Sequence, residues 1–201
     1  MRRVLVACEY SGRVRNAFAN RGWDAWSCDL LPSETPGKHY QGDVRDMLFE
    51  PVWDFLIAHP PCTHLAVSGA RHFAAKQASG VQQEALDFVR MLLDVDVPHI
   101  ALENPVSIIS SRIRKPDQII QPHQFGHPEF KATCLWLKNL PKLVPTNPLA
   151  IPAKGTPEFK EWERVHRMPP GADRWKERSR TYENVATAFA DQWGSWIEGQ
   201  Q

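Results

Sequence analysis

The stretch Phe55-Leu56-Ile57-Ala58-His59-Pro60-Pro61-Cys62-Thr63 decides the fold and points to a site. Its first four residues are an apolar run of the kind found in buried strands. Because proline fixes its own φ and favours extended geometry in the residue before it, Pro60-Pro61 ends the strand in a rigid loop. Cys62 follows directly, so the loop would hold one thiol in a defined direction, as covalent catalysis requires. A structural cysteine after a proline turn is the alternative, since free cysteine often packs as a small apolar residue.

Strand and helix patterns alternate through the first hundred residues. Apolar runs predict strands at residues 3–8, 24–28, 53–58 and 97–102. Apolar stripes predict helices at residues 12–21 and 81–93. This alternation indicates a Rossmann-like α/β fold, a mostly parallel sheet with helices on both faces.

The polar residues that follow the predicted strands are candidates for a site. Ligands of such sheets bind beyond the carboxyl ends of the strands. Four polar or reactive residues come at or just after predicted strand ends: Glu9, Asp29, Cys62 and Glu103. We therefore expect a site at this edge of the sheet.

The second half of the chain has weaker patterns. Two further strands are predicted around 119–120 and 134–137, and a closing helix at 181–197. Residues 141–171 are rich in proline and basic residues, so we expect mostly loop there. At 201 residues, the whole chain is expected to be one domain, with 138–180 as a basic, loop-rich insertion.

Composition limits the class of protein. The chain has four widely spaced cysteines and no C-x-x-C pair, so a disulfide framework or a structural zinc site is not expected. The apolar run after Met1 is too short for a signal peptide or a membrane span. The expectation is a soluble cytoplasmic protein of a bacterium or a phage-infected host. The sequence does not predict an oligomeric state.

The net charge of +1 hides an uneven distribution. Between Lys138 and Arg180, ten Lys/Arg stand against five Asp/Glu, whereas the rest of the chain holds fourteen against eighteen. Cationic and aromatic residues together suit phosphate contact and base stacking. The candidate nucleic-acid-binding residues are Arg164, Arg167, Arg174, Lys176, Arg178 and Arg180. A solvated loop face with packed tryptophans is the alternative.

The order of the motifs resembles that of the cytosine-C5 DNA methyltransferases, over most of the chain. Segment 4–12 occupies the place of the family's first strand and glycine loop, although only Gly12 remains of several glycines. Pro60-Pro61-Cys62 is similar to the family's nucleophile loop, with Thr63 in place of the usual glutamine. The other matching segments are Gly42-Asp43-Val44, Glu103-Asn104-Pro105, Phe125-Gly126-His127-Pro128-Glu129-Phe130-Lys131 and Glu183-Asn184-Val185.

This resemblance implies S-adenosylmethionine as cofactor, DNA as partner and no metal. Asp29 matches the acidic residue that binds the ribose hydroxyls, and Asp43 the aspartate that meets the adenine amino group. The implied cofactor-binding residues are Glu9, Tyr10, Ser11, Gly12, Asp29, Leu30, Asp43, Val44, Pro60, Asn184 and Val185. The implied catalytic residues are Cys62, Glu103 and Lys131, which stands where the family has arginine.

The chemistry explains these residue types. Cytosine C5 becomes nucleophilic once a thiolate, here that of Cys62, adds to C6. Glu103, with its pKa raised by burial, would supply a proton or hydrogen bond to N3. A cytosine stacked in duplex DNA is out of reach, so it must be flipped out or already single-stranded.

Simpler interpretations remain open at several positions. Asp29 and Asp43 would also suit turns or helix caps, and Glu103 could cap the segment after it. Glu9 would either approach the ammonium group of the cofactor or be a solvated acid. His59 and His64 flank the nucleophile and lack metal-ligand spacing.

Three other functions were compared with methylation of DNA. A zinc deaminase needs P-C-x-x-C, but position 65 is Leu65, so this class is rejected. Methylation of a free pyrimidine nucleotide and a non-catalytic relative that binds S-adenosylmethionine or DNA remain alternatives. Only about fifty residues occupy the place of the family's target-recognition domain, so low or short sequence specificity is expected. Such a compact enzyme would suit a phage.

Overall fold

A sheet of seven strands organises the part of the chain that the computed structural model describes, residues 1–48, 52–169, 171 and 174–200. The buried strands lie where apolar runs predict them. Their bounds are β1 Arg3–Ala7, β2 Asp24–Asp29, β3 Lys38–Gln41, β4 Phe55–Ala58, β5 His99–Pro105, β6 Gln118–Ile120 and β7 Thr133–Lys138.

The strand order is β3-β2-β1-β4-β5-β7-β6. The first five strands in this order pair in parallel, whereas β7 is antiparallel to both β5 and β6. The predicted Rossmann-like α/β fold class, a mostly parallel sheet with helices on both faces, is confirmed.

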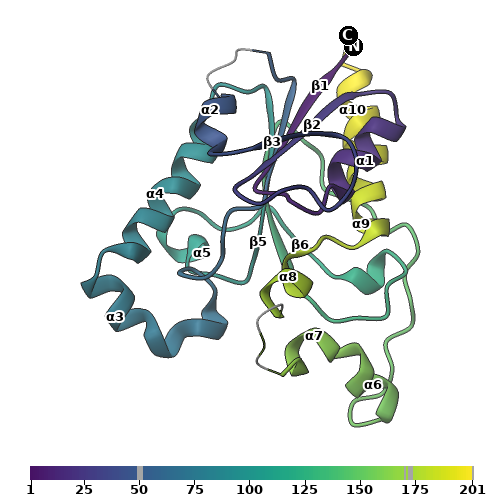
Figure 1. The fold of residues 1–201 in the computed structure, drawn as a ribbon. Helices are drawn as coiled ribbons and strands as arrows, with labels where there is room; N and C mark the ends of the chain where they lie inside the picture. Colours follow the sequence, from purple (N-terminus) through teal and green to yellow (C-terminus); the bar gives the residue numbers. More distant parts are fainter. Residues whose placement is uncertain (49–51, 170, 172–173, 201) are drawn as a thin grey trace.

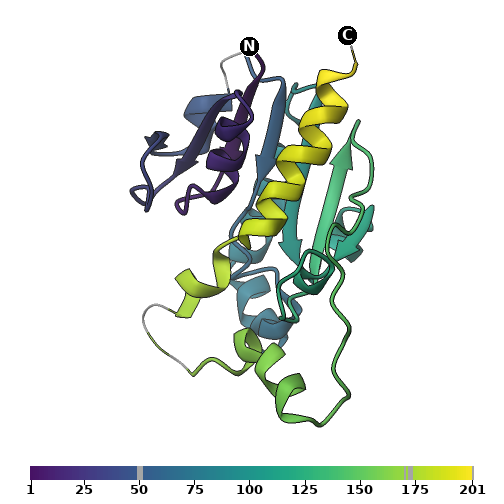
Figure 2. The same ribbon diagram turned by 90° about the vertical axis from the view of Figure 1, so that its right-hand side faces the viewer.

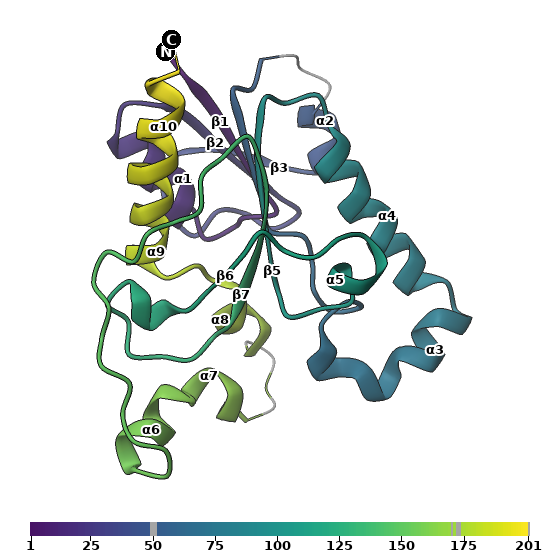
Figure 3. The same ribbon diagram turned by 180° about the vertical axis from the view of Figure 1, so that it is seen from behind.

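Helices cover both faces of the sheet, which Figures 1 and 3 view nearly edge-on. One face carries α1 Arg13–Asn20, α9 Glu183–Ala188, the π-helical turn η3 Phe189–Trp193 and α10 Gly194–Glu198. The other face carries α2 Val44–Leu48, α4 Val81–Asp94 and α5 Ile109–Arg112. Helix α1 packs against α9 and η3, so the first helix and the start of the C-terminal helical segment are neighbours.

Alternating side chains of the central strands fill two apolar cores. In β1, Val4 and Val6 face the core under α1 and α9, and Leu5 and Ala7 face the core under α4. Strand β4 repeats the pattern, because successive side chains of a strand point to opposite faces. A strand buried on both faces reads as a continuous apolar run, which explains why the sequence reveals β1 and β4 clearly.

Short helices gather at the carboxyl ends of the parallel strands. They are η1 Val67–His72, α3 Phe73–Ala78, η2 Pro122–Gln124, α6 Pro157–Trp162, α7 Arg164–Arg167 and α8 Arg174–Ser179. Figure 2 shows α6, α7 and α8 at this end of the molecule, while β1 begins and α10 ends at the opposite end.

Some sequence-based expectations were incomplete. Segment 141–171 includes α6 and α7, and residue 170 lies outside the described residues. The predicted closing helix begins at Glu183 and is interrupted by η3. Strand β3 was not predicted, because Lys38–Gln41 is a polar strand at the edge of the sheet. In the described residues, no helix is both long enough and apolar enough to cross a membrane.

Candidate active site

A cavity of about 530 Å³ opens at the carboxyl ends of β1, β4 and β5. One side is formed by the loop after β4 and the beginning of η1, and the other by α7 and α8. Nine of the residues predicted from the sequence line it: Glu9, Tyr10, Ser11, Pro60, Cys62, Glu103, Lys131, Arg178 and Arg180. The sheet thus brings together the predicted nucleophile, its catalytic partners and part of the predicted cofactor loop.

Backbone and side-chain bonds fix the loop that carries Cys62. The carbonyl oxygen of Cys62 accepts hydrogen bonds from the amides of Leu65, at 3.0 Å, and Ala66, at 2.9 Å. Asn104, from the end of β5, donates its Nδ2 to the carbonyl oxygen of Pro60 at 2.9 Å. The Glu103-Asn104 pair therefore has two tasks, since Asn104 holds the loop while Glu103 enters the cavity. The sequence marked Asn104 only as part of a motif.

The Cys62 thiol lies in an environment that disfavours its thiolate. Burial raises its pKa, and the nearby Glu103 carboxylate adds to this effect. Arg178 and Lys131 act in the opposite direction without reversing it. The thiol therefore needs a proton acceptor before it can attack a substrate.

Glu103 differs from the sequence-based expectation. Burial alone would raise its pKa, but the hydrogen bond and the electrostatic interaction with His59 outweigh burial, aided by Lys131, and leave the pKa below its ordinary value. His59 Nδ1 lies 3.1 Å from Glu103 Oε2. The prediction that burial raises the pKa of Glu103 is thus wrong. The sequence missed this pairing because His59 and Glu103 are 44 positions apart and come from adjacent strands.

Lys131 lies at the junction of the site with the C-terminal segment. Its Nζ donates to the carbonyl oxygen of Arg180 at 3.3 Å and stands 5.5 Å from the centre of the Tyr182 ring. Burial lowers the pKa of Lys131, and the charge of Arg178 adds to this, while Glu103 and Cys62 oppose it. Lys131 and Arg178 therefore place positive charge around the thiol and the carboxylate.

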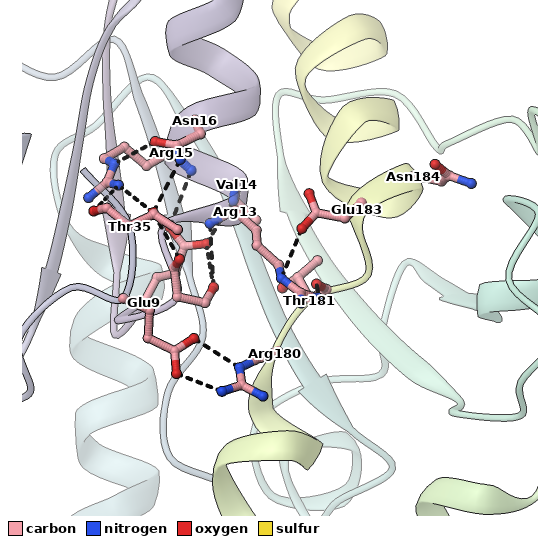
Figure 4. Close-up of polar contacts among 12 residues, drawn as sticks. Glu9, Arg13, Val14, Arg15, Asn16, Thr35, Arg180, Thr181, Glu183 and Asn184 are labelled. Carbon is pink, nitrogen blue, oxygen red and sulfur yellow. Dashed lines mark hydrogen bonds and ion pairs between the residues drawn. The ribbon is translucent and has the colours of Figure 1, made fainter. Parts of the chain in front are cut away.

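Glu9 caps helix α1, which neither interpretation of this residue anticipated. It is 4% exposed, so it is not a solvated acid. Its Oε1 accepts from the Val14 amide at 2.7 Å, and its Oε2 from the Arg15 amide at 3.2 Å. Ser11 Oγ also donates to Glu9 Oε1, at 3.2 Å. Figure 4 shows this carboxylate turned towards the start of the helix. Carboxylates at a helix N-terminus are stabilised by the free amides and the helix dipole.

The Arg15 side chain is packed beside the turn before α1. Its guanidinium is buried and donates to Ser27 Oγ and Ser33 Oγ, each at 3.0 Å, and to the carbonyl oxygen of Pro36, at 2.9 Å. Gly12 has φ +72°, and a Cβ there would collide with Thr35 Oγ1 and with the Arg15 guanidinium. This packing explains why position 12 requires glycine.

The end of β2 fits an adenosine. Asp29 accepts a hydrogen bond from the Leu31 amide through Oδ1 at 2.9 Å, and burial raises its pKa. Leu30 beside it is 74% exposed and offers apolar surface to a flat base. Cys8, which lines the cavity, interacts electrostatically with Asp29 and Asp43, so this region adjoins the cavity. The Asp29 carboxylate and the exposed Leu30 side chain are compatible with an adenosine, although neither residue is part of the cavity lining itself.

Two other residues assigned to the cofactor have structural partners. Asp43 Oδ1 accepts from the Arg45 amide at 2.9 Å, and Oδ2 lies 2.8 Å from Arg45 Nη1, so Asp43 caps α2. Val44 is 4% exposed and belongs to the apolar core. Its side chain therefore does not face a ligand, which corrects the expectation for this residue.

The segment before α9 returns to the start of α1, but through other residues than expected. Arg13 Nη1 donates to the carbonyl oxygen of Thr181 at 2.8 Å, and Arg13 Nε lies 3.0 Å from Glu183 Oε1. Asn184 is exposed, points away from this cluster in Figure 4 and lies near Gly126. Val185 is buried in the core. The contacts that join this segment to the start of α1 therefore come from Arg13, Thr181 and Glu183, and not from the side chains of Asn184 and Val185.

Among the described residues, ion pairs within the chain involve Arg164, Arg167 and Arg180, which were predicted to bind nucleic acid. Arg164 Nε lies 2.9 Å from Glu129 Oε1, and Arg167 Nε lies 2.8 Å from Glu163 Oε2. Arg180 pairs with Glu34 and Glu177. Their charges are thus partly neutralised, which the sequence count of charges did not reveal. The other three, Arg174, Lys176 and Arg178, belong to α8.

Tyr10 fastens α8 to the loop after β1. Its hydroxyl donates to the carbonyl oxygen of Lys176 at 2.8 Å and lies 3.0 Å from Ser179 Oγ. The rings of Tyr10 and Trp175 are 6.0 Å apart. Residues from the two ends of the chain thus build one wall of the cavity.

Comparisons with known proteins give only a fold similarity. No protein-family model matches the chain, and none of the curated proteins matches it. A crystal structure from E. coli, described as a "putative DNA modification methyltransferase encoded within prophage", has 15% sequence identity and a TM-score of 0.47, over 75% of this chain and 53% of that one. The chain therefore spans about half the length of that protein. A similarity of this extent carries no statement about activity.

Proposed function

We propose that this protein transfers a methyl group from S-adenosylmethionine to C5 of cytosine in DNA, through a covalent bond between Cys62 and C6. The observation that carries the proposal is the meeting of Cys62, Glu103, Lys131 and Arg178 in one cavity at the carboxyl edge of the sheet. Glu103 comes from β5, Lys131 from the loop before β7, and Arg178 from α8. A proline-directed cysteine beside a carboxylate and two cations is suited to adding sulfur to a pyrimidine ring.

Each side chain has a task in this chemistry. Cys62 attacks C6, and the electron pair of the C5–C6 double bond moves into the ring. Glu103, one oxygen of which is held by His59, accepts a hydrogen bond from the N4 amino group of the base with its other oxygen. Lys131 and Arg178 stabilise the negative charge that develops on the ring.

Bound S-adenosylmethionine supplies an electrophilic methyl group. Asp29 would accept hydrogen bonds from its ribose, Leu30 would pack on its adenine, and Tyr10 would border the end that adjoins the cavity. Asp43 would contact the adenine only if its ion pair with Arg45 opens. These assignments follow from the exposure and partners of the side chains.

DNA is the favoured substrate because basic and aromatic side chains of α8 border the cavity. Arg178 and Trp175 line it, and Trp175 is 51% exposed. An exposed indole beside a guanidinium suits base stacking and phosphate contact. Since Arg164, Arg167 and Arg180 are engaged in ion pairs, we expect α8 to carry most of the contact. Little base readout is expected from so small a surface.

The test is a covalent trap. DNA that contains 5-fluorocytosine should form a stable adduct with the protein in the presence of S-adenosylmethionine, because fluorine cannot leave as a proton. Cys62→Ser should form none, whereas Cys134→Ser, a buried cysteine outside the cavity lining, should retain it. An adduct that persists in Cys62→Ser would overturn the assignment of the nucleophile.

A substrate panel tests the class of substrate. Duplex DNA, single-stranded DNA, RNA and dCMP are incubated with labelled S-adenosylmethionine. We expect label in DNA. Label in dCMP alone would assign the protein to nucleotide methylation, and cofactor binding without any transfer would favour a non-catalytic relative.

A further inference from the structure

An unpartnered imidazole nitrogen belongs to a histidine that lines the same cavity as the candidate nucleophile. His59 stands three positions before Cys62 and lines the same cavity, and its side chain is 9% exposed. Its Nε2 is buried and has no hydrogen-bond partner among the described residues. Buried polar atoms are ordinarily bonded, so this nitrogen calls for a partner that the folded chain does not supply.

The bond to Glu103 determines which ring nitrogen is free to react. An ionised carboxylate only accepts hydrogen bonds, so Nδ1 of His59 carries the hydrogen shared with Glu103 Oε2. In the neutral ring, Nε2 then holds a lone pair. A histidine oriented by a carboxylate, with its second nitrogen bare and a thiol in the same cavity, has the form of a general base.

We infer that His59 is the general base of this site and takes the proton of the Cys62 thiol as the sulfur attacks. The inference rests on the proposed function for the atom attacked, C6 of cytosine. A general base is required because burial raises the pKa of the Cys62 thiol and so favours its protonated form. The step pairs the resulting imidazolium with the Glu103 carboxylate.

The proton balance of the step is closed within the site. The S–H bond of Cys62 breaks, a bond from hydrogen to Nε2 forms, and the S–C6 bond forms. The imidazolium stays paired with the Glu103 carboxylate, while Lys131 and Arg178 stabilise the negative charge on the ring. After methyl transfer to C5, the C5 proton leaves to water and the S–C6 bond breaks. The departing thiolate then takes back the Nε2 proton of the imidazolium.

Lys131 is the rival base. It adjoins both Cys62 and Glu103, and burial lowers its pKa. Its Nζ already donates to the carbonyl oxygen of Arg180, however, and its positive charge favours the thiolate. The other ionisable or charged groups that interact with His59 or share the cavity wall with it are Cys8, Glu9, Tyr10, Asp29, Cys62, Glu103, His166, Arg178 and Arg180.

The test measures the thiol without any substrate. The rate at which iodoacetamide alkylates Cys62 is followed by peptide mass spectrometry from neutral to alkaline pH. His59→Asn keeps an amide donor near the position of Nδ1 but has nothing at the position of Nε2. We expect it to slow alkylation at neutral pH by about tenfold or more, and to match the parent protein at alkaline pH, where hydroxide ionises the thiol directly.

His64→Asn is the matched control. His64 lies two positions after Cys62, and the described lining of the cavity does not include it. Its alkylation profile should follow that of the parent protein. Lys131→Met tests the rival: a neutral-pH loss in this variant that is absent from His59→Asn would assign the base to Lys131 and overturn the inference.

Further outcomes decide the inference. Equal rates in His59→Asn and the parent protein, with equal melting temperatures, would overturn it. A loss of similar size at every pH would reduce His59 to a residue that only shapes the loop. Because no nucleic acid is present, these results stand even if the protein methylates nothing. If it does methylate DNA, His59→Asn should also slow adduct formation on 5-fluorocytosine DNA.

Discussion

Arg180 and Glu34 lie 146 positions apart in the sequence, yet their side chains form a two-point ion pair, with Nε 2.9 Å from Oε2 and Nη2 2.6 Å from Oε1. Arg180 follows α8 directly, and Glu34 belongs to the loop between β2 and β3. The pair therefore links the segment that borders the cavity to the region expected to hold the adenosine. Figure 4 shows Arg180 pointing towards this loop.

The Arg180–Glu34 pair predicts a pH dependence of stability. The hydrogen bond from Arg180 lowers the pKa of Glu34 below its ordinary value of 4.5. A lowered folded-state pKa means that the pair stabilises the protein at neutral pH and that this is lost as pH falls through the folded-state pKa. Because both side chains are partly exposed, we expect only about 0.2–1 kcal/mol.

Glu34→Gln measures this contribution. The difference in unfolding free energy between the parent protein and Glu34→Gln should be present at pH 7 and shrink in acid below about pH 4.5. Glu158→Gln is a suitable control, since Glu158 is exposed and lies far along the chain in α6. A difference that is independent of pH would contradict the prediction.

The Tyr10 hydroxyl is expected to hold α8 in place. Tyr10→Phe removes the bonds to Lys176 and Ser179 but keeps the ring contact with Trp175. We expect a loss of stability of about 1 kcal/mol and faster amide exchange in residues 174–180. Hydrogen exchange read by mass spectrometry measures this.

Tyr40→Phe provides the comparison for Tyr10→Phe. It also removes one hydroxyl bond, to Asp46 in α2, on a part of the sheet distant in the strand order from β5. Exchange in 174–180 should stay unchanged in this variant. Equal exchange in both variants would show that Tyr10 does not fasten α8.

Asp29 and Asp43 should differ in their effect on the cofactor. Asp29 accepts backbone hydrogen bonds and stands beside exposed Leu30, whereas both oxygens of Asp43 are engaged by the Arg45 amide and guanidinium. Asp29→Ala should weaken S-adenosylmethionine binding about tenfold or more, since a buried bond to a charged group contributes on the order of 1–3 kcal/mol.

Calorimetry of the two alanine variants measures this difference. Asp43→Ala should weaken binding less, because Arg45 already occupies that carboxylate. A larger effect at Asp43 than at Asp29 would indicate that the ion pair opens when the cofactor binds and would reverse the order of the two contacts.

The sequence was a good guide to the sheet and a poorer guide to its periphery. Strands β1 and β4 are apolar on both faces, so periodicity and composition agree. In contrast, no residue of η1 or α3 is buried, so these elements have no apolar stripe to detect. They are shaped by the end of the nucleophile loop and the start of α4.

The sequence was sufficient to locate the candidate site. It could not show which side chains of the site are bonded to one another. Strand ends identified Cys62, Glu103 and Asp29, because parallel strands share one carboxyl edge. The partner of each side chain depends on strand order, which a single sequence does not reveal. His59 was therefore set aside as a lone histidine, and Arg180 was assigned to phosphate although it pairs with Glu34.

Gly12 is expected to be irreplaceable for a reason beyond its φ. Gly12→Ala would place a Cβ at φ +72° and against Thr35 and Arg15. Gly22→Ala has a similar φ, +86°, and no atom within 4 Å of its Cβ. Left-handed backbone alone costs a non-glycine residue about 1–2 kcal/mol, so the second variant should lose about that much and Gly12→Ala more. Equal losses in thermal unfolding would contradict the role of Arg15 in the turn.

Arginines of α8 and arginines that form ion pairs within the chain should respond differently to replacement by alanine. Replacing Arg174 and Arg178 by Ala should weaken DNA binding and flatten its salt dependence, because fewer phosphates are contacted. Replacing Arg164 and Arg167 by Ala should mainly lower the melting temperature, since these residues pair with Glu129 and Glu163. Fluorescence anisotropy at several salt concentrations separates the two. A larger loss of DNA affinity in the Arg164/Arg167 variant would refute this division.

The bond from Tyr10 to the backbone of Lys176 has a consequence for the order of events during synthesis. Cys62 and Glu103 emerge from the ribosome well before residue 176, so most of the sheet can assemble while one wall of the cavity is still missing. The reactivity of Cys62 and the binding of ligands would then both begin only when the last quarter of the chain docks on the first strand. A partly made chain would carry a thiol that nothing yet encloses.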